Sequence, residues 1–132
     1  MTAYPLTAGV TLLIVLLLFY TVVGVGRARK RFGIRAPAIS GHEIFERAHR
    51  IQMNSLEWAV MFLPTLWILA AYVGDRVALI VGLCGLAGRL WYALAYARDP
   101  ARRSGGFLLG MLAFGAAGLG AGLGVARVVF GF

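Results

Sequence analysis

The sequence predicts an all-α integral membrane protein, a bundle of four membrane-spanning helices that forms a single domain over residues 1–132. Three observations lead to this fold class. Hydrophobic residues make up 61% of the chain. Four largely apolar segments, the second of which begins with a polar stretch, each reach the roughly 20 residues that a helix needs to cross a bilayer. The charged residues lie mainly in the segments between these stretches.

The four helices are expected at residues 6–26, 43–73, 77–97 and 107–129. The first span contains no charge, and no basic residue precedes it. It is longer than the apolar core of a cleaved leader, about 7–15 residues, so we expect a retained helix. The fourth span is rich in small residues, which permit close approach of helices within a membrane. Its glycines are Gly110, Gly115, Gly118, Gly120, Gly122 and Gly124.

The charge distribution predicts the orientation of the chain in the membrane. The sequence has 13 basic and 5 acidic residues, a formal net charge of +8. Loops 27–35 and 98–103 carry five and three of the basic residues, whereas the loop between the second and third spans has one base and one acid. By the positive-inside rule, both basic loops should face the cytoplasm and both termini the opposite side. Anionic membrane lipids are therefore the expected partners of these loops, and no nucleic acid is expected.

A polar stretch, FERAHRIQMNSLEW at residues 45–58, opens the second span. With 100° of rotation per helical residue, four of its side chains fall in a sector of about 80°. These are Glu46, Arg50, Asn54 and Glu57. Gln52 and Ser55 project in other directions, so this part of the helix is polar on several sides and belongs inside a bundle or against another subunit. Two interpretations account for the pattern: an internal ion-pair network, with Arg50 as the candidate partner of Glu57, or a site for a zwitterionic ligand.

The third span carries a second polar face. Arg89, Tyr92 and Tyr96 follow the i, i+3, i+7 spacing that places them on one side of a helix. Tyrosines near a membrane surface commonly form an aromatic belt. Arg89 lies within the apolar span, where a charge requires a partner. We expect it to pair with an acidic residue of the second helix, in preference to contacting a ligand.

The remaining reactive side chains predict no further site. Cys84 is the only cysteine and lies in an apolar stretch, so we expect a buried, unreactive thiol and no disulfide. His42 and His49 are seven residues apart with no cysteine or further histidine to join them, so no metal site is expected.

Four short motifs resemble those of the MAPEG family, the membrane-associated proteins in eicosanoid and glutathione metabolism. They are FERxxRxxxNxxE from Phe45, FLPTLW from Phe62, GRxxYxxxY from Gly88 and DPxRR from Asp99. The resemblance covers nearly the whole chain, including four spans of matching length, and the sequence is similar to the microsomal glutathione transferases of the family. It implies a homotrimer in which glutathione is held between adjacent subunits near the cytoplasmic face.

The resemblance also implies an activity, the transfer of glutathione to hydrophobic electrophiles, with peroxidase activity on lipid hydroperoxides as an additional expectation. Glutathione would be the co-substrate, and no metal would take part. Residues at matching positions imply these glutathione contacts: Arg50, Asn54 and Glu57 for charged and amide groups, Gln52, Tyr92 and Tyr96 for hydrogen bonds, and Arg29 or Lys30 for a carboxylate. Arg103 matches the arginine that stabilises the glutathione thiolate, and the adjacent Arg102 is the alternative.

The same resemblance leaves a second function class open. One member of the family is not an enzyme, so a non-enzymatic lipid-binding or scaffold protein with the same fold is the alternative to a transferase. That member lacks the arginine at the position of Arg50, whereas this chain has it. The presence of both Arg50 and Arg103 therefore favours the enzymatic interpretation.

Overall fold

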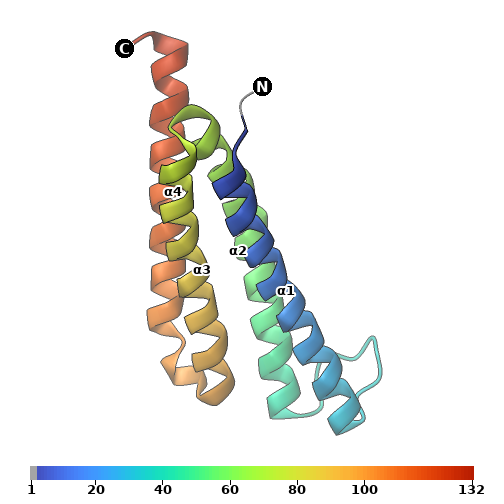
Figure 1. Ribbon diagram of the computed structural model, residues 1–132. Helices are drawn as coiled ribbons and strands as arrows, with labels where there is room; N and C mark the ends of the chain where they lie inside the picture. Colours follow the sequence, from blue (N-terminus) through green and yellow to red (C-terminus); the bar gives the residue numbers. More distant parts are fainter. Residues whose placement is uncertain (1–2) are drawn as a thin grey trace.

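The computed structural model describes residues 3–132 as four long helices and one short 3-10 turn. In chain order these are α1 (Pro5–Phe32), α2 (Glu43–Tyr72), α3 (Asp75–Arg98), η1 (Pro100–Arg102) and α4 (Ser104–Phe130). The chain runs up and down, so both termini lie at one end and the 33–42 and 99–103 segments lie at the other (Figure 1). Each long helix is apolar and long enough to cross a membrane. The predicted all-α, four-helix membrane fold is confirmed.

Helix α1 continues beyond the predicted membrane span. The charge-free stretch ends at residue 26, but the helix ends only at Phe32, and Gly33 follows in the left-handed conformation with its N–H donating to the carbonyl of Arg29. Arg29, Lys30 and Arg31 occupy the last turn, where positive charge interacts favourably with the helix dipole. Charge therefore marks the expected limit of the hydrocarbon region here, whereas a glycine marks the end of the helix.

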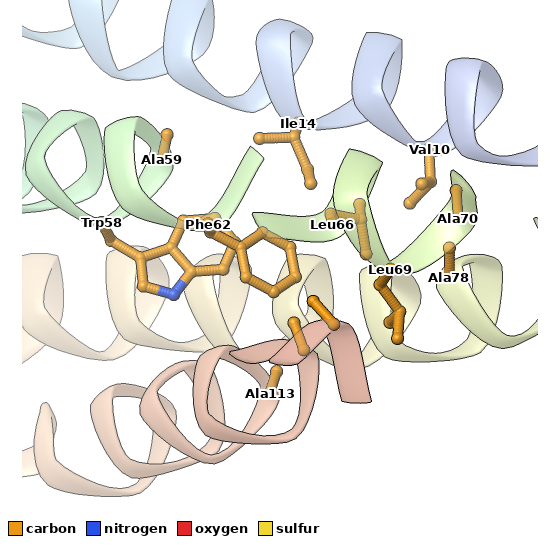
Figure 2. Close-up of a cluster of buried hydrophobic side chains, with 12 residues drawn as sticks. Val10, Ile14, Trp58, Ala59, Phe62, Leu66, Leu69, Ala70, Ala78 and Ala113 are labelled. Atoms are coloured by element: carbon orange, nitrogen blue, oxygen red, sulfur yellow. The ribbon is translucent and has the colours of Figure 1, made fainter. Parts of the chain in front are cut away.

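The hydrophobic core is built around α2. Trp58 and Phe62 stack with ring centroids 4.3 Å apart; Trp58 lies at one end of the cluster drawn in Figure 2, and Phe62 lies next to it, between α1 and α4. Helix α1 contributes Val10 and Ile14 from one side, and α4 contributes small residues such as Ala113 from the other (Figure 2). Large side chains on α2 and small ones on α4 allow α2 to pack against the other three long helices.

Helices α3 and α4 touch through their backbones. A β-carbon added at Gly106 would lie 2.3 Å from the backbone nitrogen of Tyr92, and one added at Gly88 would lie 2.6 Å from the backbone nitrogen of Gly110. No side chain fits at such distances, so glycine permits this approach. The predicted role of small residues in the fourth span is thus confirmed at Gly110. It is also confirmed at Gly120 and Gly124, where an added β-carbon would lie 2.7 Å from a Leu69 side-chain carbon and 2.9 Å from the Tyr72 β-carbon. At three further glycines no atom lies within 4 Å of an added β-carbon: Gly115, Gly118 and Gly122.

The helices form two pairs that diverge toward the end with the basic loops. Figure 1 shows α1 beside α2 and α3 beside α4, with the pairs spreading apart at that end. A small cluster of Ile51, Tyr92 and Ala93 still joins α2 to α3 there. The polar stretch of α2 therefore lies where the bundle opens.

At the end with the termini, α1 is fixed to α3 by one carboxylate. Asp75 accepts hydrogen bonds from the backbone nitrogens of Leu6 (3.0 Å) and Thr7 (2.8 Å) and from the Thr7 hydroxyl (2.6 Å). The first N–H groups of a helix have no partner within the helix, so Asp75 caps α1 from a neighbouring element. This contact closes the bundle at the end opposite the polar stretch.

The expectation of a buried Cys84 is wrong. Its side chain is exposed on α3. Apolar neighbours predict burial in a soluble protein, but a membrane helix is apolar on the side that faces lipid as well as on the side that faces the bundle. The surroundings of Cys84 in the sequence therefore do not distinguish the two positions.

We predict that Gly106→Ala lowers the free energy of unfolding by about 1–3 kcal/mol, because the added methyl group forces α3 and α4 apart. Thermal unfolding in detergent measures the effect. Gly118→Ala is the matched control on the same helix, where the added methyl group meets no atom within 4 Å. Equal melting temperatures of the two variants would contradict the proposed backbone contact.

Candidate active site

A cavity of about 880 Å³ opens between α2, α3 and the beginning of α4, at the end of the bundle that carries the basic loops. Its volume is within the range of small-molecule sites, about 300–1,000 Å³. Charged and amide groups come from α2, tyrosines from α3, and a cation from the loop before α4. The lining residues are Arg50, Asn54, Glu57, Tyr92, Tyr96, Ala101, Arg103, Ser104 and Phe107. We call this space the polar cavity.

The α2 side of the polar cavity carries charges of both signs. Arg50 and Glu57 are exposed, and neither forms an ion pair within residues 3–132. The proposed partnership of Arg50 with Glu57 is therefore wrong, because seven residues of helix hold the two groups too far apart. Glu46, the fourth member of the predicted polar face, lines an adjoining hollow together with Arg50. A cation and a carboxylate remain available to one ligand.

Arg89 lies directly behind this surface. Its side chain is only 1% exposed, and its Nη2 donates to Asn54 Oδ1 (2.9 Å) and Ser55 Oγ (3.0 Å). The expected acidic partner on the second helix is wrong: an amide and a hydroxyl hold the guanidinium, which also lies 4.1 Å from the ring centroid of Tyr92. Because Asn54 Oδ1 accepts from Arg89, the amide NH₂ is the end of this side chain that is free to donate to a ligand.

Arg103 and Arg102 point to different places. Arg103 lines the polar cavity, lies 5.7 Å from the ring centroid of Tyr96 and donates through Nη1 to the carbonyl of Pro100 (2.8 Å). Arg102 lines a separate groove on α3, and its Nε lies 3.9 Å from Asp99 Oδ2. Of the two arginines considered from the sequence, only Arg103 reaches the polar cavity.

Three predicted site residues lie outside the polar cavity of the single chain. Gln52 projects from another side of α2. Arg29 donates to the carbonyl of Ala38 (2.7 Å) and lies 4.8 Å from the ring centroid of Phe45. Lys30 is exposed and forms no ion pair in the part of the chain that the structure describes. The polar cavity of the single chain therefore does not include these three predicted residues.

Sequence reasoning missed two useful parts of the cavity wall. Ser104, the first residue of α4, contributes a hydroxyl, and Phe107 contributes an apolar surface one turn later. Their signal in the sequence is their spacing. Residues three apart lie on one side of a helix, and Ser104 and Phe107 come one and four residues after Arg103. Phe107 gives the polar cavity one apolar wall, suited to a hydrophobic group.

An all-helical membrane protein with a charged cavity at one end of its bundle is the class that fold and site define. The sequence model of the MAPEG family matches residues 7–129. This chain belongs to the MAPEG family.

Three curated relatives are similar to this chain over most of its length. An uncharacterized protein of Synechocystis sp. is 43% identical over 78% of this chain and 75% of its own length. Leukotriene C4 synthase of Cavia porcellus is 41% identical over 74% of this chain and 65% of its own length. Microsomal glutathione S-transferase 2 of Homo sapiens is 34% identical over 70% of this chain and 63% of its own length. The chain thus spans slightly less than two thirds of the two named enzymes.

We predict that Arg89→Ala destabilises the fold by about 2–4 kcal/mol, because it leaves a cavity and removes the donor to Asn54 and Ser55. Arg89→Met should lose at most half as much, since it fills the space and removes a desolvated charge. Chemical denaturation in detergent measures both changes. An equal loss in the two variants would mean that the cation itself, and not its volume, holds α3 to α2.

Proposed function

We propose that this protein is a membrane glutathione transferase that conjugates glutathione to hydrophobic electrophiles. The observation that carries the proposal is the convergence of six predicted site residues on one cavity. They are Arg50, Asn54, Glu57, Tyr92, Tyr96 and Arg103. Membership of the MAPEG family and similarity to two glutathione-related enzymes support the same activity.

The chemistry of glutathione matches the polar cavity group by group. The tripeptide carries two carboxylates, one ammonium group, two amides and a thiol. Arg50 supplies a cation for a carboxylate, and Glu57 supplies a carboxylate for the ammonium group. Asn54 supplies an amide NH₂ for a peptide carbonyl, because its oxygen is already held by Arg89. A ligand with only one sign of charge would leave one of these groups unpaired.

Arg103 is assigned the catalytic role. A free thiol has a pKa of about 8.5, and the thiolate is the nucleophile. A guanidinium beside the sulfur lowers the pKa of the glutathione thiol and stays protonated itself. The thiol proton first leaves to solvent. The thiolate then attacks an electrophilic carbon and forms a carbon–sulfur bond, while the bond from that carbon to its leaving group breaks and the leaving group departs with the electron pair. Phe107 provides an apolar wall at which the hydrophobic electrophile can lie.

The same thiolate supports the additional peroxidase activity. Attack on the terminal oxygen of a lipid hydroperoxide breaks the oxygen–oxygen bond and gives a glutathione sulfenic acid and, after protonation, a lipid alcohol. A second glutathione then condenses with the sulfenic acid to give oxidised glutathione and water. No group beyond two glutathione molecules is required.

A homotrimer completes the site in this proposal. Three predicted residues lie outside the polar cavity of their own chain: Gln52, Arg29 and Lys30. In a trimer, each subunit would bring these three residues to the rim of the polar cavity of the adjacent subunit. Gln52 would add a hydrogen bond, and Arg29 or Lys30 would pair with the second carboxylate of glutathione. Because Arg29 is already bound to the Ala38 carbonyl, Lys30 is the freer of the two cations.

We predict that Arg103→Ala raises the pKa of the thiol of bound glutathione by about 1–3 units, because a positive charge within a few ångströms of the thiolate is lost. Ultraviolet absorbance of the thiolate, followed against pH in a stopped-flow instrument, measures the shift. Arg102→Ala is the matched control, since Arg102 lies on a separate groove. An unshifted titration in Arg103→Ala would remove the proposed catalytic role. Absence of glutathione binding by the wild type would leave the non-enzymatic alternative.

We predict that mixed assemblies recover activity that two inactive variants lack. Arg50→Ala removes one side of a shared site and Gln52→Ala removes the other. When both chains are co-expressed in equal amounts, every mixed trimer contains one intact site, so about one quarter of all sites regain function. Activity per assembly measures the recovery. No recovery in trimers verified as mixed by mass spectrometry would place both residues in the site of one subunit.

A further inference from the structure

A second cavity lies at the same end of the bundle as the polar cavity, between α1, α2 and α3. Its volume is about 160 Å³, and it shares no lining residue with the polar cavity. The cluster of Ile51, Tyr92 and Ala93 lies between the two, because Ile51 and Ala93 line the second cavity and Tyr92 lines the first. We call the second space the lateral cavity.

The lining of the lateral cavity is apolar or small apart from Tyr20, Thr21 and two arginines. The apolar and small residues are Gly24, Ile44, Ala48, Ile51, Ala93, Leu94 and Ala97. Arg27 comes directly after the charge-free first span, so it lies where the hydrocarbon region gives way to the head groups. Tyr20 and Gly24 lie one to two turns deeper on α1. The lateral cavity thus has a cationic end at head-group depth. Its deeper end is mainly apolar, with Tyr20 and with Thr21, whose hydroxyl already donates to the carbonyl of Leu18.

Both arginines have unused donors. Arg47 is paired with Glu43 through Nη2, but its Nε is buried and has no hydrogen-bond partner. Arg27 is exposed and takes part in no ion pair or side-chain hydrogen bond within residues 3–132. A buried donor without an acceptor is unfavourable, so an anion placed between these two side chains would satisfy groups that the chain itself leaves open.

We propose that the lateral cavity binds an anionic phospholipid of the surrounding membrane. The phosphate accepts hydrogen bonds from Arg27 and Arg47, and the first part of one acyl chain enters the apolar end. A cavity of this volume holds an apolar group about as large as benzene, so it admits a segment of one chain, and the rest of the lipid stays in the bilayer. Basic pockets between membrane helices commonly hold anionic head groups. The proposal does not depend on the proposed transferase function.

The experiment measures lipid retention by native mass spectrometry. The full-length protein is reconstituted in phosphatidylcholine vesicles with and without phosphatidylglycerol and then released in detergent. We expect wild-type protein to retain phosphatidylglycerol in preference to phosphatidylcholine. Arg27→Gln and Arg47→Gln should each reduce that retention about fivefold. Thermal unfolding in the same lipids should show stabilisation of the wild type by phosphatidylglycerol and a smaller stabilisation of Arg27→Gln and Arg47→Gln.

Three further variants separate a built site from general charge attraction. Gly24→Leu keeps every charge but fills the lateral cavity, and it is expected to fold because an added β-carbon meets no atom within 4 Å. It should abolish preferential retention. Arg35→Gln removes an exposed cation that lines neither cavity, and Glu43→Gln breaks the pair with Arg47 while keeping both arginines. Both should retain the lipid as the wild type does.

Three results would overturn the proposal. The first is equal retention of the two lipids by the wild type. The second is a loss in Arg35→Gln as large as that in Arg27→Gln, which would indicate diffuse attraction to the basic loops. The third comes from an arm with oleate in phosphatidylcholine vesicles: stabilisation by oleate but not by phosphatidylglycerol would identify a fatty-acid carboxylate as the ligand.

Discussion

The contact between the backbones of α3 and α4 determines where the polar cavity lies. Gly106 lies against the backbone of Tyr92, and Gly88 lies against Gly110, so the two helices cannot separate or rotate independently. The register of this contact brings Arg103, at the start of α4, to the side of α3 that carries Tyr96. Because the α1–α2 pair diverges from this unit, the same constraint leaves open space on both sides of the contact between α2 and α3.

A buried cation connects this scaffold to the polar residues of α2. Arg89 reaches from α3 to Asn54 and Ser55, which are both uncharged. Because no acidic partner offsets its positive charge, the desolvation of the guanidinium costs free energy. Its effect is to fix the direction of the Asn54 amide at the wall of the polar cavity. Trp58 adds a second tie between helices by donating to the carbonyl of Gly110 (3.0 Å). The Asn54 amide at the cavity wall is therefore held by a hydrogen bond from a buried cation, while Arg50 and Glu57 beside it form no ion pair within residues 3–132.

Hydropathy and helical periodicity are local properties of a sequence. They therefore predict the four helices well, and they predict which side chains of α2 and of α3 share a polar face. Periodicity specifies the side of a helix but not the partner on the next one, and for this reason the acid expected beside Arg89 is an amide and a hydroxyl. Hydropathy does not separate lipid-facing from buried positions. For this reason the sequence predicts a buried Cys84, whereas its side chain is exposed. Arg102 and Arg103 are adjacent in the sequence, so the sequence alone does not show which of them faces the polar cavity. The short turn before α4 points them to different places. Helical periodicity also does not show that Gln52 and Lys30 lie outside the polar cavity of the single chain.

The most direct measurement is an electron cryomicroscopy structure of the assembled protein in lipid with glutathione bound. We expect a trimer with the tripeptide in each polar cavity, its sulfur beside Arg103 and one carboxylate at Arg50. Residue Gln52 of an adjacent subunit should complete the contact. Density for glutathione at another place, or a polar cavity filled by the neighbouring subunit's side chains, would contradict the account.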